Sequence, residues 1–172
     1  MYTTQGIVLK KIPAGEADAM VILYTKDFGK MRILATGVKK PEAKLKGHVE
    51  PFNFVNIQFV LGKYGERLTY CSALTVWPRM RSDLVRGALA AYTAALVDAH
   101  CFLGEKDENM WHLLLGALNA IETKDEIRQK AADFLYAVES RLLAVLGYGG
   151  EEDISTLQTP VARPFVLEYN SK

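Results

Sequence analysis

The sequence predicts an α+β protein with more than one domain, in which a small β-barrel is followed by a group of helices. Two observations predict this order. Up to about residue 75 the apolar residues come in short runs broken by Gly, Pro and Lys, as in strands joined by tight turns. After residue 78 they recur every three or four positions, as on one face of a helix. By length alone, 172 residues would fit one medium domain or two small ones.

Five strands are expected near the N-terminus, at residues 3–11, 19–25, 31–36, 54–61 and 68–74. Segments 27–30 and 62–65 contain Gly and separate the second strand from the third and the fourth from the fifth. Gly supplies the positive φ that a tight hairpin requires. Because five short strands cannot bury both faces of an open sheet, closure is the economical way to remove the edges. We therefore expect an OB-like five-stranded barrel over residues 1–80.

Three amphipathic helices are expected in a helical domain over residues 81–150. The first spans about 83–103 with Ser82 as its N-cap, and the second spans about 108–122 with Asp107 as its cap. A Thr-x-x-Glu capping box at 123–126 predicts the start of a third helix of about 22 residues, which ends at Gly147. The periodicity is then lost, and residues 151–172 are expected to form an extended or flexible C-terminal tail.

Composition and motifs exclude several classes of protein. The 49% hydrophobic and 24% charged residues exclude a disordered, collagen-like or disulfide-stapled chain. No apolar run reaches the roughly 18 residues of a membrane span and the start lacks a secretory signal, so we expect a cytoplasmic protein without membrane contact. Cys71 and Cys101 are expected as reduced, buried thiols. With no metal-ligand spacing, nucleotide loop or nucleophile motif, we expect no enzyme, no metal and no cofactor.

Charge is divided unevenly along the chain. Residues 1–81 carry 13 Lys or Arg against 6 Asp or Glu, a net charge of +7, whereas residues 82–172 carry 8 against 14, a net charge of −6. This clustering creates a local field that the overall charge of +1 conceals. The division favours an anion-binding barrel joined to a helical domain with a different role. An uneven division by chance is the alternative.

Four lysines lie within eight positions in the segment 37–48, called the basic loop below, which joins the third and fourth expected strands. Lysines this close repel one another unless a polyanion such as a nucleic-acid backbone shares the site, and a merely solubilising surface is the alternative. The further cations of the same basic half favour nucleic-acid binding. Aromatic rings that can stack on bases are interleaved with the cations: Tyr2, Tyr24, Phe28, Tyr64 and Tyr70. The cations expected to bind nucleic acid are Lys10, Lys11, Lys30, Arg32, Lys39, Lys40, Lys44, Lys46, Arg79 and Arg81.

Short runs keep a definite order and spacing along the chain. In the barrel region they are GIVL at 6–9, GEAD at 15–18, LYT at 23–25, GK at 29–30, ATGVKKP at 35–41, KL at 44–45 and PF at 51–52. In the helical region they are RSDL at 81–84 and LLAVLGY at 142–148. Together they resemble the bacterial RecO family of DNA repair proteins over about residues 3–148.

The resemblance implies an OB barrel, a helical domain and the role of a recombination mediator. Such a protein binds ssDNA and dsDNA, anneals complementary strands, and works with the partner RecR to load RecA recombinase onto DNA coated by single-strand-binding protein (SSB). The family's basic-loop positions correspond to Lys39, Lys40 and Lys44, where other members more often have an Arg. Lys keeps the charge but lacks the planar guanidinium, so we expect phosphate attraction to persist and stacking on bases to weaken.

The resemblance also implies that the helical domain receives the acidic, hydrophobic C-terminal tail of SSB. Because this domain is acidic overall, a local basic pocket using Arg86, Arg128, Lys130 or Arg141 is expected. Many family members continue with a Cys-rich zinc module after the LGY region, whereas residues 149–172 contain no cysteine. From the residues alone, a non-catalytic protein-interaction adaptor and an RNA-binding OB-fold protein remain alternatives.

Overall fold

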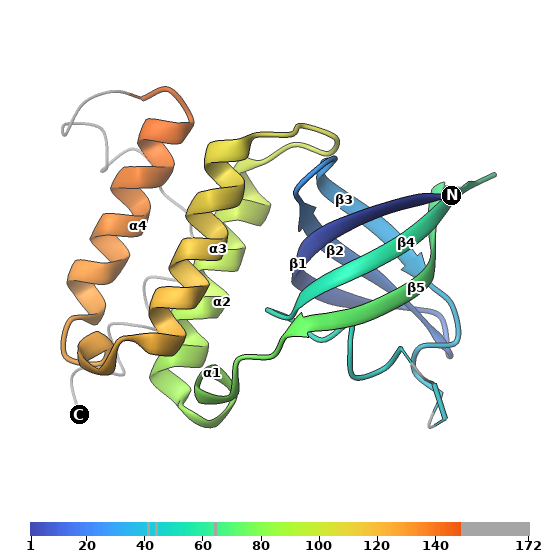
Figure 1. Cartoon of the computed structure of the whole chain (residues 1–172), viewed down its shortest axis with the longest axis horizontal. Coiled ribbons are helices and arrows are strands. Elements are labelled where there is room, and N and C mark those ends of the chain that lie inside the picture. The colour runs from blue at the N-terminus through green and yellow to red at the C-terminus, as the bar shows by residue number, and fades with distance from the viewer. Residues whose placement is uncertain (41, 44, 64, 149–172) are drawn as a thin grey trace.

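The computed structural model describes residues 1–148 except 41, 44 and 64, so the expected tail at 151–172 lies outside the described residues. Figure 1 shows a barrel beside a group of helices, which confirms the α+β fold class. The strands are β1 (Tyr2–Ala14), β2 (Asp18–Thr25), β3 (Gly29–Ala35), β4 (Phe54–Gly62) and β5 (Gly65–Thr75). The helices are α1 (Pro78–Ser82), α2 (Leu84–His100), α3 (Glu108–Thr123), the 3-10 helix η1 (Asp125–Ile127) and α4 (Ala131–Val145).

The five strands close into a barrel in the order β1-β2-β3-β5-β4, as expected for an OB-like fold. Every pair is antiparallel except β3 and β5, which run parallel with Leu34 opposite Arg67. β1 pairs with β4 through its first half and with β2 through its second half. A register shift between Val8 and Lys10 bends β1 from one neighbour toward the other.

Successive side chains of the strands belong alternately to two hydrophobic cores, one inside the barrel and one between the barrel and the helices. Val8, Val21 and Ile33 point into the barrel, while Ile7 and Tyr24 point outward and are equally buried. The outward residues belong to the same hydrophobic cluster as the helices, because α2 packs over β1. This two-sided burial follows from the period of two in a strand. The outer face of the barrel and the helical part, residues 78–145, therefore share one core, and the barrel interior forms the other.

The first helix boundary differs from the expectation. Ser82 is the last residue of α1, and its hydroxyl donates to the carbonyl of Pro78 at 3.0 Å. Asp83 is the N-cap of α2, where one carboxylate oxygen accepts from the amides of Val85 at 3.0 Å and Arg86 at 3.2 Å. A carboxylate also suits the positive end of the helix dipole. The predicted cap of the next helix, Asp107, is confirmed.

The third expected helix is shorter than predicted, and the capping box at 123–126 is wrong. Thr123 still belongs to α3, and its hydroxyl donates to the carbonyl of Asn119 at 2.8 Å instead of capping a new helix. Residues 125–127 form η1, which buries Ile127, and α4 begins only at Ala131. The described chain thus holds four α-helices where three were expected.

Candidate nucleic-acid interface

Two of the expected DNA-binding cations face the helical part. Lys10 on β1 and Lys30 on β3 both form ion pairs with the carboxylate of Asp98 on α2. The Lys30 ammonium also donates to the carbonyl of Cys101 at 3.2 Å, and its side chain is only 14% exposed. Burial by itself raises the pKa of Asp98, but hydrogen bonds from both lysines outweigh it and hold that pKa below its ordinary value. Lys30 is therefore part of the junction between barrel and helices.

Two further expected cations contact neighbouring loops. Lys11 forms an ion pair with Glu50, which follows the basic loop. The ammonium of Lys39 donates to the carbonyl of Gly15 at 2.6 Å, and its backbone amide donates to Ala17 at 2.9 Å. Lys39 thus holds the start of the basic loop on the β1–β2 turn.

Asp18, at the end of that same turn, has a structural role. Its carboxylate accepts a hydrogen bond from the amide of Gly37 at 2.7 Å and so orients the turn. No group of three metal-ligating side chains occurs in the described part of the chain.

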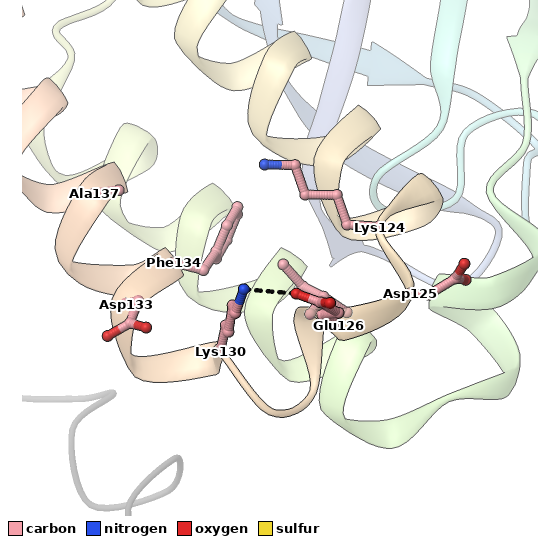
Figure 2. Close-up of a pocket in the computed structure, with 8 residues that line it drawn as sticks. Lys124, Asp125, Glu126, Lys130, Asp133, Phe134 and Ala137 are labelled. Carbon is pink, nitrogen blue, oxygen red and sulfur yellow. Dashed lines mark ion pairs between the residues drawn. The ribbon is translucent and has the colours of Figure 1, made fainter.

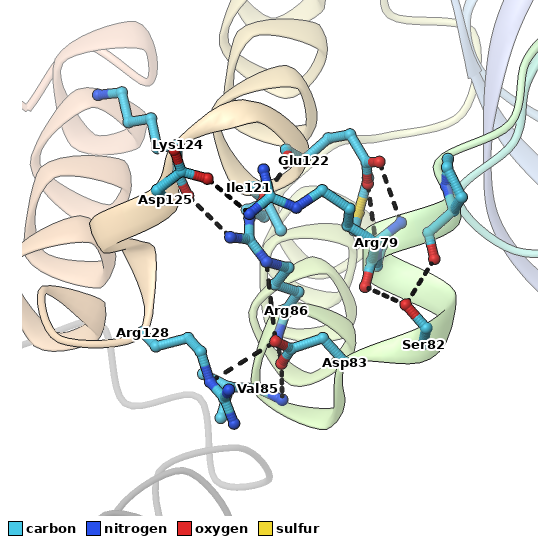
Figure 3. Close-up of polar contacts among 12 residues, drawn as sticks. Arg79, Ser82, Asp83, Val85, Arg86, Ile121, Glu122, Lys124, Asp125 and Arg128 are labelled. Atoms are coloured by element: carbon cyan, nitrogen blue, oxygen red, sulfur yellow. Dashed lines mark hydrogen bonds and ion pairs between the residues drawn. The ribbon is translucent and has the colours of Figure 1, made fainter.

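Arg79 and Arg81 on α1 point to different parts of the molecule. The guanidinium of Arg79 lies 2.7 Å from the carboxylate of Asp125, next to the end of α3 (Figure 3). The guanidinium of Arg81 donates to the side-chain oxygen of Asn53, just before β4, at 2.6 Å. The nine expected cations that the structure describes therefore do not all lie on one exposed surface.

Several cations of the barrel region are exposed and form no ion pair within the described residues; Arg32, Lys40, Lys46 and Arg67 are four of them and are called the exposed cations below. Arg32, Lys40 and Lys46 were expected to bind nucleic acid, whereas Arg67 was not among the expected cations. Arg32 shares the outer face of β3 with Leu34, whose cross-strand partner is Arg67. The two arginines thus lie on one outer face of the barrel. Lys44 lies outside the described residues.

The aromatic residues divide between base-accessible and buried positions. Tyr24 is buried and its hydroxyl contacts the backbone of Asp107; burial raises its pKa to about 12. Tyr2 is 43% exposed, stacks on Phe59 at 5.3 Å between ring centroids and meets Phe28 edge-on at 5.9 Å. Tyr70 is also exposed, whereas Tyr64 lies outside the described residues. Of the expected rings that the structure describes, Tyr2 and Tyr70 are therefore the exposed ones, and Phe28 is half-buried.

The thiols are not reactive groups of this surface. Cys71 is buried in the barrel, as expected, and burial raises its pKa to about 12. Cys101 is only half-buried at the end of α2, and burial again is the main cause that raises its pKa, to about 11. Both thiols stay protonated at neutral pH.

The helical part contains a groove between α3 and α4. One section has a volume of about 630 Å³ and is lined by Phe134, Lys124 and Lys130, the last paired with Glu126 at 2.6 Å (Figure 2). A second section of about 680 Å³ shares Phe134 and Lys124 and extends along both helices to Arg141. Apolar walls with cations at the edge suit an acidic, hydrophobic segment.

Arg86, one of the cations expected to form a basic pocket, is not available to a ligand. Its side chain is 3% exposed, and its guanidinium donates to the backbone carbonyls of Ile121, Glu122 at 3.3 Å and Lys124 at 2.9 Å (Figure 3). These carbonyls lie at the C-terminal end of α3, where they lack helical partners. Arg128 is exposed but pairs with Asp83 at 3.5 Å, outside the groove. Of the four expected residues, Lys130 and Arg141 line the groove.

No helix of the described residues is long and apolar enough to cross a membrane.

Two models of one protein family match the chain. The model described as "Recombination protein O N terminal" matches residues 1–77, which include the whole barrel. The model described as "Recombination protein O C terminal" matches residues 81–153, from the end of α1 onward.

Curated relatives give the same assignment. The "DNA repair protein RecO" of Pelotomaculum thermopropionicum is 31% identical over 148 residues, which cover 86% of this chain and 56% of the relative. Proteins of the same name from Roseiflexus sp. and Synechococcus elongatus are 33% and 32% identical and cover 86% and 95% of this chain. The chain spans 50% and 60% of those two relatives, so it corresponds to about half of their length. Matched along its barrel and its helices alike, the chain belongs to the RecO family.

Proposed function

We propose that the chain binds ssDNA and dsDNA through the exposed cations of its barrel and acts as a mediator in recombinational DNA repair. Membership of a family whose members are named for DNA repair supports this role. The observation that carries the proposal is that Arg32, Lys40, Lys46 and Arg67 are exposed without an acidic partner among the described residues. Cations left free in this way attract phosphates and release the counterions condensed on DNA.

The proposed mechanism is electrostatic and needs no catalytic residue. Two complementary strands repel each other through their phosphates, and a cationic surface lowers that repulsion while they pair. Tyr2 and Tyr70 offer exposed rings on which a base of a single strand can stack. Annealing then proceeds without breaking a covalent bond.

Fluorescence anisotropy with a single-stranded oligonucleotide tests the DNA-binding surface. One variant carries Ala at Lys39, Lys40, Lys44 and Lys46, and a second carries Arg32→Ala with Arg67→Ala. Each should bind more weakly than the wild type, and the log–log salt dependence should flatten by about 0.7 for each lost phosphate contact.

The matched control is Lys106→Ala with Arg128→Ala, which removes two positive charges from exposed positions of the helical part. If affinity falls as much in this control as in the arginine variant, the effect comes from net charge and the barrel surface is not the binding site. Unchanged affinity in both barrel variants would likewise exclude the proposed surface.

We further propose that the groove between α3 and α4 receives the acidic, hydrophobic C-terminal tail of SSB. The groove combines the apolar side chains of Phe134 and Val138 with the cations Lys124 and Arg141, which complements such a peptide in both respects. Calorimetric titration should show binding of a tail peptide that is lost in Lys124→Ala with Arg141→Ala. A peptide that produces no heat at high micromolar concentration would exclude this partner.

The mediator role also includes RecR as a partner and the loading of RecA. A strand-annealing assay with complementary oligonucleotides, each coated by the cognate SSB, tests the central step. The chain should accelerate annealing on coated strands, and the two barrel variants should be slower. Equal rates with and without the chain would contradict a mediator role.

A further inference from the structure

Residues 52 and 53, which follow the basic loop, are held by side chains from the start of the helical part. The indole nitrogen of Trp77 donates to the carbonyl of Phe52 at 3.0 Å, and Arg81 donates to the side-chain oxygen of Asn53 at 2.6 Å. Trp77 precedes α1 directly and Arg81 belongs to it. The segment that follows the basic loop is thus held by α1 and by the residue that precedes this helix, both outside the barrel.

Asn53, which accepts from Arg81, also contacts the basic loop itself. Its side chain is buried, with the residue only 1% exposed, and its amide nitrogen donates to the carbonyls of Gly47 and His48, each at 3.0 Å. Because those two carbonyls only accept, the nitrogen must face the loop and the oxygen must face away. Arg81 supplies the donor for that oxygen, which is otherwise costly to bury unpaired. The orientation of the Asn53 amide therefore links Arg81 to the loop.

The backbone at this point is strained, which indicates that its surroundings impose its position. Phe52 has a φ of 71°, in the left-handed region that residues with a side chain rarely adopt. Its amide donates to the carbonyl of Val8 at 2.7 Å and its carbonyl accepts from Trp77. A conformation of this kind persists only where the contacts around it over-determine it.

On the opposite side, the basic loop is attached to the barrel. The imidazole Nδ1 of His48 accepts a hydrogen bond from the amide of Ala73 on β5 at 3.1 Å. Gly47 and His48 directly follow Lys46, one of the exposed cations. Their position therefore determines where the ammonium of Lys46 can be presented.

We propose that Arg81 is a positioning residue for DNA binding: acting through Asn53, it holds the basic loop in place before DNA arrives. This inference rests on the proposed function, since it assumes that the loop binds DNA. A loop that is already ordered loses less conformational entropy on binding than one that must first be ordered. The sequence grouped Arg81 with the DNA-contacting cations, whereas its guanidinium contacts Asn53.

The first test measures hydrogen exchange in the full chain without DNA. In Arg81→Gln the amides of residues 45–49 should exchange faster, while those of α3 remain as in the wild type. Arg81→Lys should restore part of the protection, because the ammonium can also donate to Asn53. Arg128→Gln is the matched control, since it removes the same charge from an exposed side chain that does not contact the loop. Unchanged exchange at 45–49 in Arg81→Gln would overturn the proposal.

The second test separates positioning from direct contact with DNA. Arg81→Gln and the uncharged change Asn53→Ala should each weaken ssDNA binding, by about fivefold if the loop must be ordered on binding. The double variant should bind no more weakly than either single variant, because both remove the same link. Losses that multiply in the double variant would show that Arg81 contacts DNA directly and would overturn the proposal.

Failure of this inference is distinguishable from failure of the proposed function. If the four-lysine variant and the variant Arg32→Ala with Arg67→Ala both bind DNA like the wild type, the proposed function is wrong, whatever the exchange data show. If the four-lysine variant loses affinity while Arg81→Gln and Asn53→Ala do not, DNA binding stands and the positioning role is refuted. Thermal unfolding of each variant, followed by circular dichroism, ensures that only folded chains are compared.

Discussion

At the junction with the helices, Lys10 and Lys30 both point at Asp98, whereas on the outer barrel Arg32 and Lys40 remain exposed without a described acidic partner. All four cations belong to the same basic half of the chain and were expected to serve one purpose. The difference between the two regions is the acidic side chain that a distant helix supplies to one of them. The distribution of charges along the chain therefore predicts a positive electrostatic field around the barrel. It does not predict which cations are free to bind DNA.

The physical reason lies in solvation. A cation at a packed junction loses water and is tolerated only when an anion or carbonyl compensates, as Asp98 and the Cys101 carbonyl do for Lys30. An exposed cation keeps its hydration and needs no partner until a polyanion arrives. Substitutions at the junction should consequently alter stability, and substitutions of the exposed cations should alter DNA binding.

The largest effect on stability is expected for Arg86→Ala, inside the helical part. The change leaves the C-terminal carbonyls of α3 without their buried donor and should lower the free energy of unfolding by about 3–5 kcal/mol. Urea denaturation followed by circular dichroism measures it. Arg128→Ala is the control, because Arg128 pairs with Asp83, as Arg86 also does at 3.8 Å, but is 59% exposed, and it should cost less than about 1 kcal/mol. Equal losses in the two variants would contradict the role assigned to Arg86.

Asp98→Asn should have the next largest effect. It keeps the shape of the side chain but leaves Lys10 and Lys30 facing each other without an anion, which should cost about 1–3 kcal/mol in urea denaturation. Glu126→Gln is the control, since its ion pair with Lys130 is exposed on both sides and should contribute less than about 1 kcal/mol. A loss for Asp98→Asn no larger than this control would show that the junction does not depend on the carboxylate.

The stabilisation from Asp98 should depend on pH in a definite direction. Its pKa is lowered in the folded chain, so the contribution is fully present above the ordinary carboxyl pKa of about 4 and is lost as pH falls through the folded value. The difference in Tm between wild type and Asp98→Asn should therefore be constant near pH 7 and shrink in acid below about pH 4. A difference that persists undiminished until both chains unfold in acid would contradict this.

The smallest effect on stability is expected for Arg32→Ala with Arg67→Ala. Neither side chain has an ion pair in the described chain, so the free energy of unfolding should change by no more than about 0.5 kcal/mol per site. The same variant should bind ssDNA more weakly than the wild type. If it loses more stability than Asp98→Asn, the separation of structural from binding cations is wrong.

Sequence patterns predicted the strands and helix caps correctly where the structure depends on residues close together in the chain. The short apolar runs between turn residues located the five strands, and Asp107 was recognised as a cap because its carboxylate reaches the first free amides of its own helix. The prediction of helix starts failed where neighbouring residues, or two hydrogen-bonding arrangements of one residue, suit the sequence equally well. Ser82 and Asp83 both suit a cap, and Thr123 suits both a capping box and a bond to the preceding turn. Contacts such as those of Arg86 with the end of α3 decide between such options.

The sequence by itself determined the order of barrel and helices, the closed five-stranded topology, the family and the basic character of the N-terminal half. These follow from periodicity, turn residues and charge, which act over a few positions. Only the tertiary structure decided which cations stay exposed, that Arg67 lies beside β3, and that Arg81 reaches Asn53. Those outcomes depend on partners 28 to 88 positions away, as for Arg81 with Asn53 and Lys10 with Asp98. Packing, which no local pattern encodes, brings such groups together.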